Sequence, residues 1–104
     1  MLTSSMASSD PRLILLAPED NCLAVAASLD AGAVLLVDGA HVTLAVPVGI
    51  GHKLARRDIV VNEKILKYGA VIGHATVPIG RGDHIHLHNL ASDYIATYVL
   101  PATA

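Results

Sequence analysis

The sequence has no phenylalanine or tryptophan and only three tyrosines, so few aromatic side chains are available for a core. Valine, isoleucine, leucine and alanine must form the core instead, and apolar residues make up 53% of the 104 residues. A chain of this length fits one domain with a modest core. A small domain with such an apolar composition is expected to bury part of its surface against another chain. That chain is either a different partner or a second copy in a homo-oligomer.

Cysteine and charge are also scarce. Cys22 is the only cysteine, which excludes an intrachain disulfide and favours a reducing compartment. Charged residues make up 15% of the chain, the net charge is −2, and no basic stripe predicts nucleic-acid binding. No apolar run approaches the ~20 residues that span a bilayer, and residues 1–10 lack the features of a secretory signal. The sequence therefore predicts a cytoplasmic protein that binds neither membrane nor nucleic acid.

Glycine and proline recur from Ala33 onward and separate short runs rich in β-branched residues. This pattern predicts a compact all-β fold with at most one short helix. Asp38-Gly39 is typical of a hairpin turn, whereas the alanine-rich segment 21–29 allows either a helix or a strand. No repeat of 20 or more residues is evident. The predicted strands span residues 12–17, 34–37, 41–46, 53–59, 64–67, 71–77 and 84–88.

Six histidines are the peculiarity of the composition, and three of them alternate in the run HIHLH at residues 84–88. Alternate side chains of a strand share a face, so we expect the three imidazoles on one face and the two apolar residues anchored in the core. Neutral imidazole binds Zn, Fe, Ni or Cu, and Asn89 can add an oxygen or orient a ring. A metal or substrate site and a solvent-facing, histidine-rich strand both fit this pattern.

Two glycine-containing turns carry lysines. In segment 49–53 two glycines allow a ligand to approach closely, and Lys53 can hold a carboxylate as a point charge. In segment 67–69, Lys67 supplies a cation and Tyr68 a hydroxyl that can transfer a proton. Each segment also fits a simple turn with an exposed side chain. Cys22 lies in an apolar stretch, so we interpret it as a buried small side chain rather than a nucleophile.

The order of these motifs along the chain resembles the SAF-type domain of the altronate/galactarate dehydratase family. The resemblance covers residues 12–90, and it implies a β-clip fold. Together with the composition it divides the chain into a disordered tail at 1–11, a SAF-like β-clip domain at 12–91 and a C-terminal arm at 92–104. The segments that carry the resemblance are Gly51-His52-Lys53, Lys67-Tyr68-Gly69, Ile72-Gly73-His74-Ala75-Thr76, and Gly82-Asp83 followed by Ile85-His86-Leu87-His88-Asn89.

The resemblance also implies a function. Members of this family dehydrate sugar acids such as altronate or galactarate, usually with a divalent metal such as Fe²⁺. The domain precedes a large catalytic domain or accompanies it as a second chain. We therefore expect a small subunit, inactive alone, whose large catalytic partner holds most of the metal. A related pair of subunits eliminates sulfite from sulfolactate, and that reaction is an alternative.

The family motif also assigns roles to single residues. It implies catalytic roles for His86, His88, Lys67 and Tyr68. It implies substrate binding by His52, Lys53 and Asn89, with His86 and His88 as an incomplete set of metal ligands. His84 departs from the pattern, since a bulky hydrophobic residue is common at that position.

A binding or assembly module is the alternative from a different class of protein. SAF-like domains also occur in antifreeze proteins and at the end of sialic acid synthases, where they bind ice or sugars. A flat, threonine-rich face would favour ice binding, and this sequence lacks one. A third hypothesis is a metal-dependent regulator of the large subunit, in which case the isolated small chain would bind metal.

Overall fold

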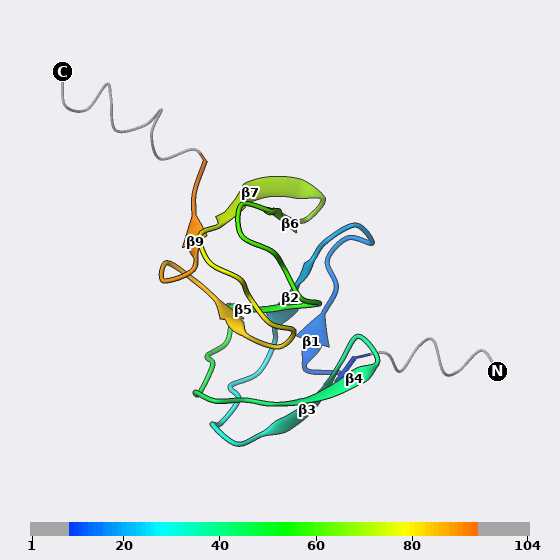
Figure 1. Ribbon diagram of the computed structural model, residues 1–104. Coiled ribbons are helices and arrows are strands. Elements are labelled where there is room, and N and C mark those ends of the chain that lie inside the picture. The colour runs from blue at the N-terminus through cyan, green and yellow to red at the C-terminus, as the bar shows by residue number, and fades with distance from the viewer. Residues whose placement is uncertain (1–8, 94–104) are drawn as a thin grey trace.

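All the regular secondary structure in the computed structural model, which describes residues 9–93, is β (Figure 1). This confirms the predicted all-β class. No helix in that part of the chain is long and apolar enough to cross a membrane. The expected tails fall largely outside the described residues. The strands are β1 (Leu13–Ile14), β2 (Cys22–Val25), β3 (Val34–Val37), β4 (Ala40–Thr43), β5 (Lys53–Ala55), β6 (Lys64–Lys67), β7 (Ala70–Ala75), β8 (His84–Ile85) and β9 (Leu90–Ala91).

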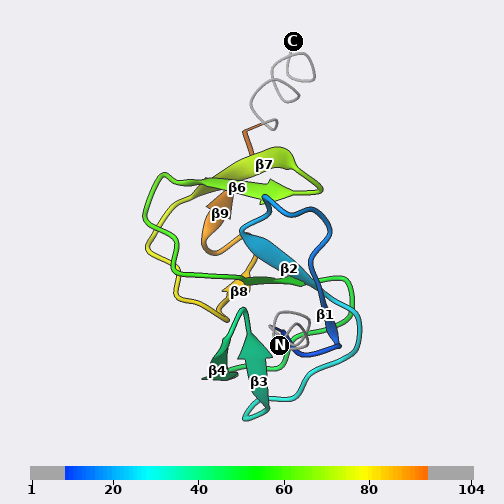
Figure 2. The same ribbon diagram turned by 90° about the vertical axis from the view of Figure 1, so that its right-hand side faces the viewer.

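The strands form three small antiparallel sheets. The central sheet has the order β1-β2-β5-β8, so it contains strands from both ends of the domain, joined through β5. The hairpin β3–β4 lies on one side of this sheet, and the sheet β6-β7-β9 lies on the other (Figure 2). The central sheet therefore holds the domain together.

The two outer sheets belong to two similar halves of the chain, a repeat that was not evident from the sequence. Leu29 bridges Val48 after the first hairpin in the same way that Ile59 bridges Ile79 after the second. Backbone hydrogen bonds match as well: Gly51 donates to Val25 and Gly82 donates to Ala55. The prediction that the chain has no repeat was wrong. The halves share the pattern Val-Pro-x-Gly-x-Gly at residues 46–51 and 77–82, which is shorter than the 20 residues that the sequence analysis required.

Each half has its own aliphatic core, as expected from the absence of phenylalanine and tryptophan. The alternation of side chains along β2 and β5 supplies both cores from the same strands. Leu23 and Leu54 are buried in the first core, while their neighbours Cys22 and Ala55 are buried in the second. The first core also contains Leu13, Val25, Leu29, Leu35, Val37, Leu44 and Val48, and the second Ile59, Ile65, Ala75, Ile79, Ile85 and Leu90.

Most predicted strands are confirmed, with one correction. Segment 21–29, for which the sequence allowed either a helix or a strand, contains strand β2. The predicted strand 84–88 was wrong beyond Ile85, because residues 86–89 form a turn. Leu87 is consequently 76% exposed instead of anchored in the core, whereas Ile85 is fully buried as expected. The short strand β9 was not predicted.

Candidate functional site

Pairing of β5 with β8 brings two histidines together. Leu54 lies opposite His84 in the ladder, and His52 immediately precedes β5. Gly51 adopts the left-handed conformation (φ 88°) that lets the chain turn sharply into this strand. The result is a distance of 3.0 Å between Nδ1 of His52 and Nε2 of His84.

His86 completes what we call the histidine cluster, which consists of His52, His84 and His86. Each ring offers a nitrogen, and these nitrogen atoms all lie within 4.8 Å of one another. The rings of His84 and His86 stack with centroids 5.5 Å apart and an interplanar angle of 8°. His88 lies beside the cluster, with its ring centroid 5.7 Å from that of His84. The three histidines predicted to share a face thus do gather, but through a turn rather than a strand.

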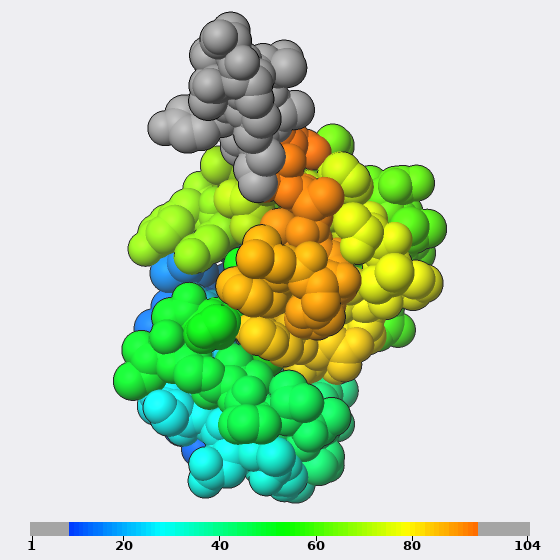
Figure 3. Space-filling view, turned by 90° about the vertical axis from the view of Figure 1, so that its left-hand side faces the viewer, coloured from blue at the N-terminus to red at the C-terminus, as the bar shows by residue number. Residues whose placement is uncertain are grey.

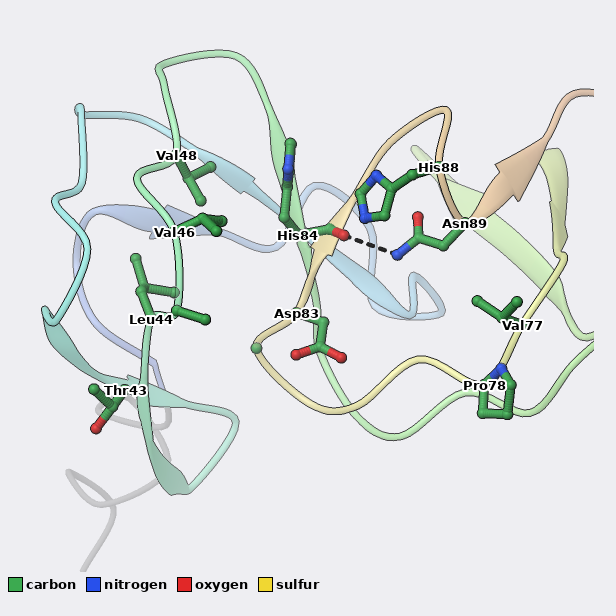
Figure 4. A pocket seen from close by; sticks show the side chains of 12 residues that line it. Thr43, Leu44, Val46, Val48, Val77, Pro78, Asp83, His84, His88 and Asn89 are labelled. Atoms are coloured by element: carbon green, nitrogen blue, oxygen red, sulfur yellow. Dashed lines mark hydrogen bonds between the residues drawn. The ribbon is translucent and has the colours of Figure 1, made fainter.

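Asn89 holds this turn in place. Its side-chain oxygen accepts a hydrogen bond from the backbone N–H of His86, and its amide group donates to the carbonyl of His84, each at 2.9 Å (Figure 4). The side chain is 5% exposed, so water competes little for these bonds. Asn89 therefore sets the path of the backbone between two members of the cluster, and its amide is already bonded to backbone.

The environment of His84 favours neutral imidazole. Burial lowers the pKa of His84, and neighbouring His52, His86, His88 and Lys53 lower it further. A neutral ring keeps a nitrogen lone pair free for a proton or a metal ion. The site can therefore accept a proton or hold a metal near neutral pH.

Two lysines lie near each other beside β2. Burial lowers the pKa of Lys53, and the charge of Lys67 lowers it further. Within residues 9–93, no carboxylate forms an ion pair with either lysine. Lys53 directly follows His52, so it adjoins the histidine cluster in the chain. A half-buried cation without a counter-ion is a suitable place for an anion.

Tyr68 is placed next to this pair by a carboxylate that the sequence analysis did not single out. Asp20 is 2% exposed and accepts hydrogen bonds from the backbone N–H groups of Tyr68 (2.8 Å) and Gly69 (2.7 Å). These bonds fix the β6–β7 corner, where the Tyr68 side chain stays 70% exposed. An acidic residue beside an apolar strand was the available signal for Asp20, but its partners are far away in sequence.

Cys22 is buried, as interpreted from the sequence. Its side chain is 3% exposed, and its thiol donates a hydrogen bond to the carbonyl of Leu66 at 3.2 Å. Burial raises the pKa of Cys22 to about 11, although Lys53 and Lys67 act in the opposite direction. The thiol therefore stays protonated near neutral pH and is a poor nucleophile.

A groove of about 540 Å³ lies beside the histidines (Figure 4). It runs between the segment that follows β4 and the segment around β8, which lie against each other on one face of the molecule (Figure 3). Val46, Val48 and Val77 give it apolar walls, and His84 and His88 border it. The groove thus leaves space beside the cluster for a substrate or for a segment of another chain.

The structure brings together most of the residues predicted as a site. His52 and His86 meet in the cluster, His88 lies beside it, and Lys53 lies near Lys67. Lys67 and Tyr68 lie at the β6–β7 corner, and Asn89 lies in the turn that follows β8. His84, which the family pattern had set aside, belongs to the cluster as well, and the three rings all contact one another.

The chain was compared with known protein families and with characterised proteins. Residues 11–93 match the altronate/galactarate dehydratase SAF domain. Altronate dehydratase from Escherichia coli (strain K12) is 41% identical over 70 residues, which are 67% of this chain but 14% of that protein. Altronate dehydratase from Bacillus subtilis (strain 168) is 38% identical over 71 residues, or 68% of this chain and again 14% of that protein.

A shorter relative also matches. The alpha subunit of (2R)-sulfolactate sulfo-lyase from Chromohalobacter salexigens is 46% identical over 41 residues, which are 39% of this chain and 44% of that subunit. The chain thus spans about one seventh of the length of the altronate dehydratases and less than half of this subunit.

Proposed function

Because the chain belongs to the altronate/galactarate dehydratase SAF-domain family, we propose that it is the small subunit of a sugar-acid dehydratase, a carbon–oxygen lyase. In this proposal it contributes side chains to an active site that a large catalytic subunit completes, and it is inactive alone. The much greater length of the altronate dehydratases supports a large catalytic partner. The observation that carries the proposal is the position of Lys53, which follows His52 directly, lies opposite Ile85 and has no carboxylate partner within residues 9–93.

Sugar-acid dehydration is a β-elimination. A base removes the proton next to the substrate carboxylate, and the neighbouring hydroxyl leaves as water. Removal of this proton builds up negative charge on the substrate carboxylate. Cations placed beside that carboxylate therefore lower the barrier. Lys53 and Lys67 suit this role because a bound carboxylate would relieve the repulsion between them and supply the counter-ion that they lack.

Proton transfer falls to the exposed groups around this pair. His86 and His88 are both exposed, and a neutral imidazole can accept one proton and donate another. The hydroxyl of Tyr68 is exposed beside Lys67 and can protonate the leaving hydroxyl. His52 contacts the substrate from the position just before β5, and Asn89 supports substrate binding by holding the turn that carries His86.

A divalent metal fits the donor set of this site. The histidine cluster offers three imidazole nitrogens, and no carboxylate of residues 9–93 belongs to this group. When bound, an ion such as Fe²⁺ would stabilise negative charge on the substrate oxygens as a Lewis acid. The family resemblance assigned most of the metal ligands to the large subunit.

Co-expression with the large dehydratase subunit tests the proposal. Each chain alone and the complex are assayed against altronate, galactarate and related aldonates for the 2-keto-3-deoxy product, with and without Fe²⁺. We expect turnover only when both chains are present. Full activity of the large chain alone would refute the catalytic roles proposed here.

Two matched lysine variants sharpen this test. Lys67→Met removes the proposed carboxylate ligand, and we expect KM to rise at least about tenfold, since one charge-assisted contact is lost. Lys64→Met is the control, because Lys64 is exposed on the same strand and pairs with Asp93 instead. Equal KM values for the two variants would count against a carboxylate site at Lys67.

Sulfolactate is the second candidate substrate. The sulfo-lyase relative is named as a subunit, which matches a chain of this size better than the long altronate dehydratases do. The substrate panel therefore includes sulfolactate with detection of sulfite. Release of sulfite without dehydration of any sugar acid would assign the chain to that reaction.

A further inference from the structure

We infer that His52, His84 and His86 form a transition-metal site that this chain carries by itself. The inference deepens the proposed function. Only the catalytic role of the metal rests on that function, whereas metal binding itself does not. It replaces the incomplete pair His86 and His88 with a different set of three ligands. It also goes beyond the expectation that the large subunit holds most of the metal.

The distances within the cluster suit shared coordination. Nitrogen ligands bind such metals at about 2.0–2.1 Å, so two ligands of one ion lie about 3–3.4 Å apart. Nδ1 of His52 and Nε2 of His84 are already 3.0 Å apart. The largest separation in the cluster is 4.8 Å, and rotation of the exposed His86 ring can shorten it. Little rearrangement is needed for all three rings to reach one ion.

The backbone that carries the three rings is held in place before any ion binds. The carbonyl of His52 accepts a hydrogen bond from Val25 at 2.9 Å. His84 lies in β8 opposite Leu54. The backbone of His86 is fixed by the side chain of Asn89. Ordering of the ligands therefore costs little free energy on binding, which raises the affinity.

The ligand chemistry selects the class of metal. Three imidazoles without a carboxylate favour Zn²⁺, Fe²⁺, Co²⁺, Ni²⁺ or Cu²⁺ over Mg²⁺ and Ca²⁺, which prefer oxygen ligands. A three-histidine set leaves coordination positions for water, substrate or a ligand from a partner. Lys53 opposes the positive ion electrostatically, but it also favours an anion at those open positions. The site therefore suits a metal together with a carboxylate.

Other histidines of the described residues provide matched controls. His74 pairs with Asp93 at 2.8 Å and lies outside the cluster. His41 is exposed on β4, in the β3–β4 hairpin. His88 lies next to the cluster but outside it. A site built from the cluster should be insensitive to replacement of any of these three.

The test is a titration of the full, chelator-treated chain with Co²⁺ and, in competition, with Zn²⁺. We expect one Co²⁺ per chain with the visible absorption bands of a nitrogen-ligated ion, and a rise in Tm on addition of Zn²⁺. His84→Gln and His86→Gln should each weaken Co²⁺ binding at least about tenfold. His41→Gln, His74→Gln and His88→Gln should bind as the wild type does.

Several outcomes would overturn the inference. These are no cobalt bands in the wild type, wild-type affinity in a folded His84→Gln or His86→Gln variant, or loss of binding in His74→Gln or His88→Gln. Circular dichroism establishes that each variant is folded, and the exposed position of His86 makes that variant the safer one. Metal binding by a chain that supports no lyase activity would refute the proposed function alone. Lyase activity with no metal bound to this chain would refute this inference alone.

Discussion

Tyr68 adopts a backbone conformation that its residue type disfavours. Its φ is 57°, at the same place in the β6–β7 hairpin that Asp38 (φ 46°) occupies in the β3–β4 hairpin. Aspartate tolerates the left-handed region through local hydrogen bonds, whereas a bulky residue loses roughly 1–2 kcal/mol there. The Tyr68 side chain is 70% exposed, so packing does not offset this cost. Strain without a packing gain favours a functional role for the hydroxyl.

Replacing Tyr68 by glycine separates stability from function. Tyr68→Gly relieves the strain, so we expect the free energy of unfolding to stay the same or rise by up to about 1 kcal/mol. Turnover of the complex should fall, because the hydroxyl is lost. Urea denaturation and the dehydratase assay measure the two effects. Asp38→Gly is the control in the other hairpin and should keep full turnover, and a fully active Tyr68→Gly complex would refute the role of Tyr68.

Asp20 stabilises the same β6–β7 corner by accepting hydrogen bonds from its backbone. Asp20→Asn keeps the size of the side chain but turns an amide donor toward one of the N–H groups of Tyr68 and Gly69. Because the position is buried and the lost bonds are charge-assisted, we expect a loss of about 2 kcal/mol in the free energy of unfolding. Urea denaturation measures it. Glu19→Gln, at the exposed neighbour, should change stability little, and equal losses in both variants would contradict this account.

At the scale of elements, local sequence signals predicted the hairpins but not the ends of all strands. β3 and β6 have the predicted bounds, because each aliphatic run ends at a turn that contains a left-handed glycine, Gly39 or Gly69. The run HIHLH was predicted as one strand, yet it turns after Ile85. Asn89 offers the backbone local hydrogen bonds that compete with a strand ladder. Alternation alone cannot reveal this competition.

Gly73 shows how closely β7 and β9 approach each other. A Cβ atom built at Gly73 would meet the backbone carbonyl of Ala91, which cannot move without breaking the β7–β9 pairing. We expect Gly73→Ala to lower the free energy of unfolding by about 1–3 kcal/mol, as overpacking does. Thermal denaturation and amide exchange at Thr76, whose N–H donates to the carbonyl of Asn89 at 3.0 Å, measure the loss. Gly49→Ala is the control, since its Cβ would make an ordinary 3.6 Å contact with His52. Unchanged exchange at Thr76 in Gly73→Ala would contradict the close approach.

At the scale of the molecule, the site arises from pairing between distant segments. His52 and His84 are far apart in sequence, and only the β5–β8 ladder places them 3.0 Å from each other. The ordered motifs predicted that these segments belong to one site, but no spacing in the sequence predicted their register. His84 was therefore set aside, while His52, Lys53 and His86 were predicted as site residues. The two-fold repeat was missed because the sequence pattern that the two halves share is only six residues long.

Leu87 connects the site to the rest of the proposed enzyme. It lies in the turn between His86 and His88 and is 76% exposed, so the chain presents a large apolar side chain beside its polar site. An apolar side chain in that place suits burial against the large subunit that completes the active site.

We expect Leu87→Ser to weaken binding of the large subunit at least about tenfold, because an apolar anchor is worth more than about 1.4 kcal/mol. Isothermal titration calorimetry measures the affinity. Val34→Ser, which alters an exposed apolar residue on β3 in the other half, should bind as tightly as the wild type. Wild-type affinity in a folded Leu87→Ser chain would place the interface elsewhere on the domain.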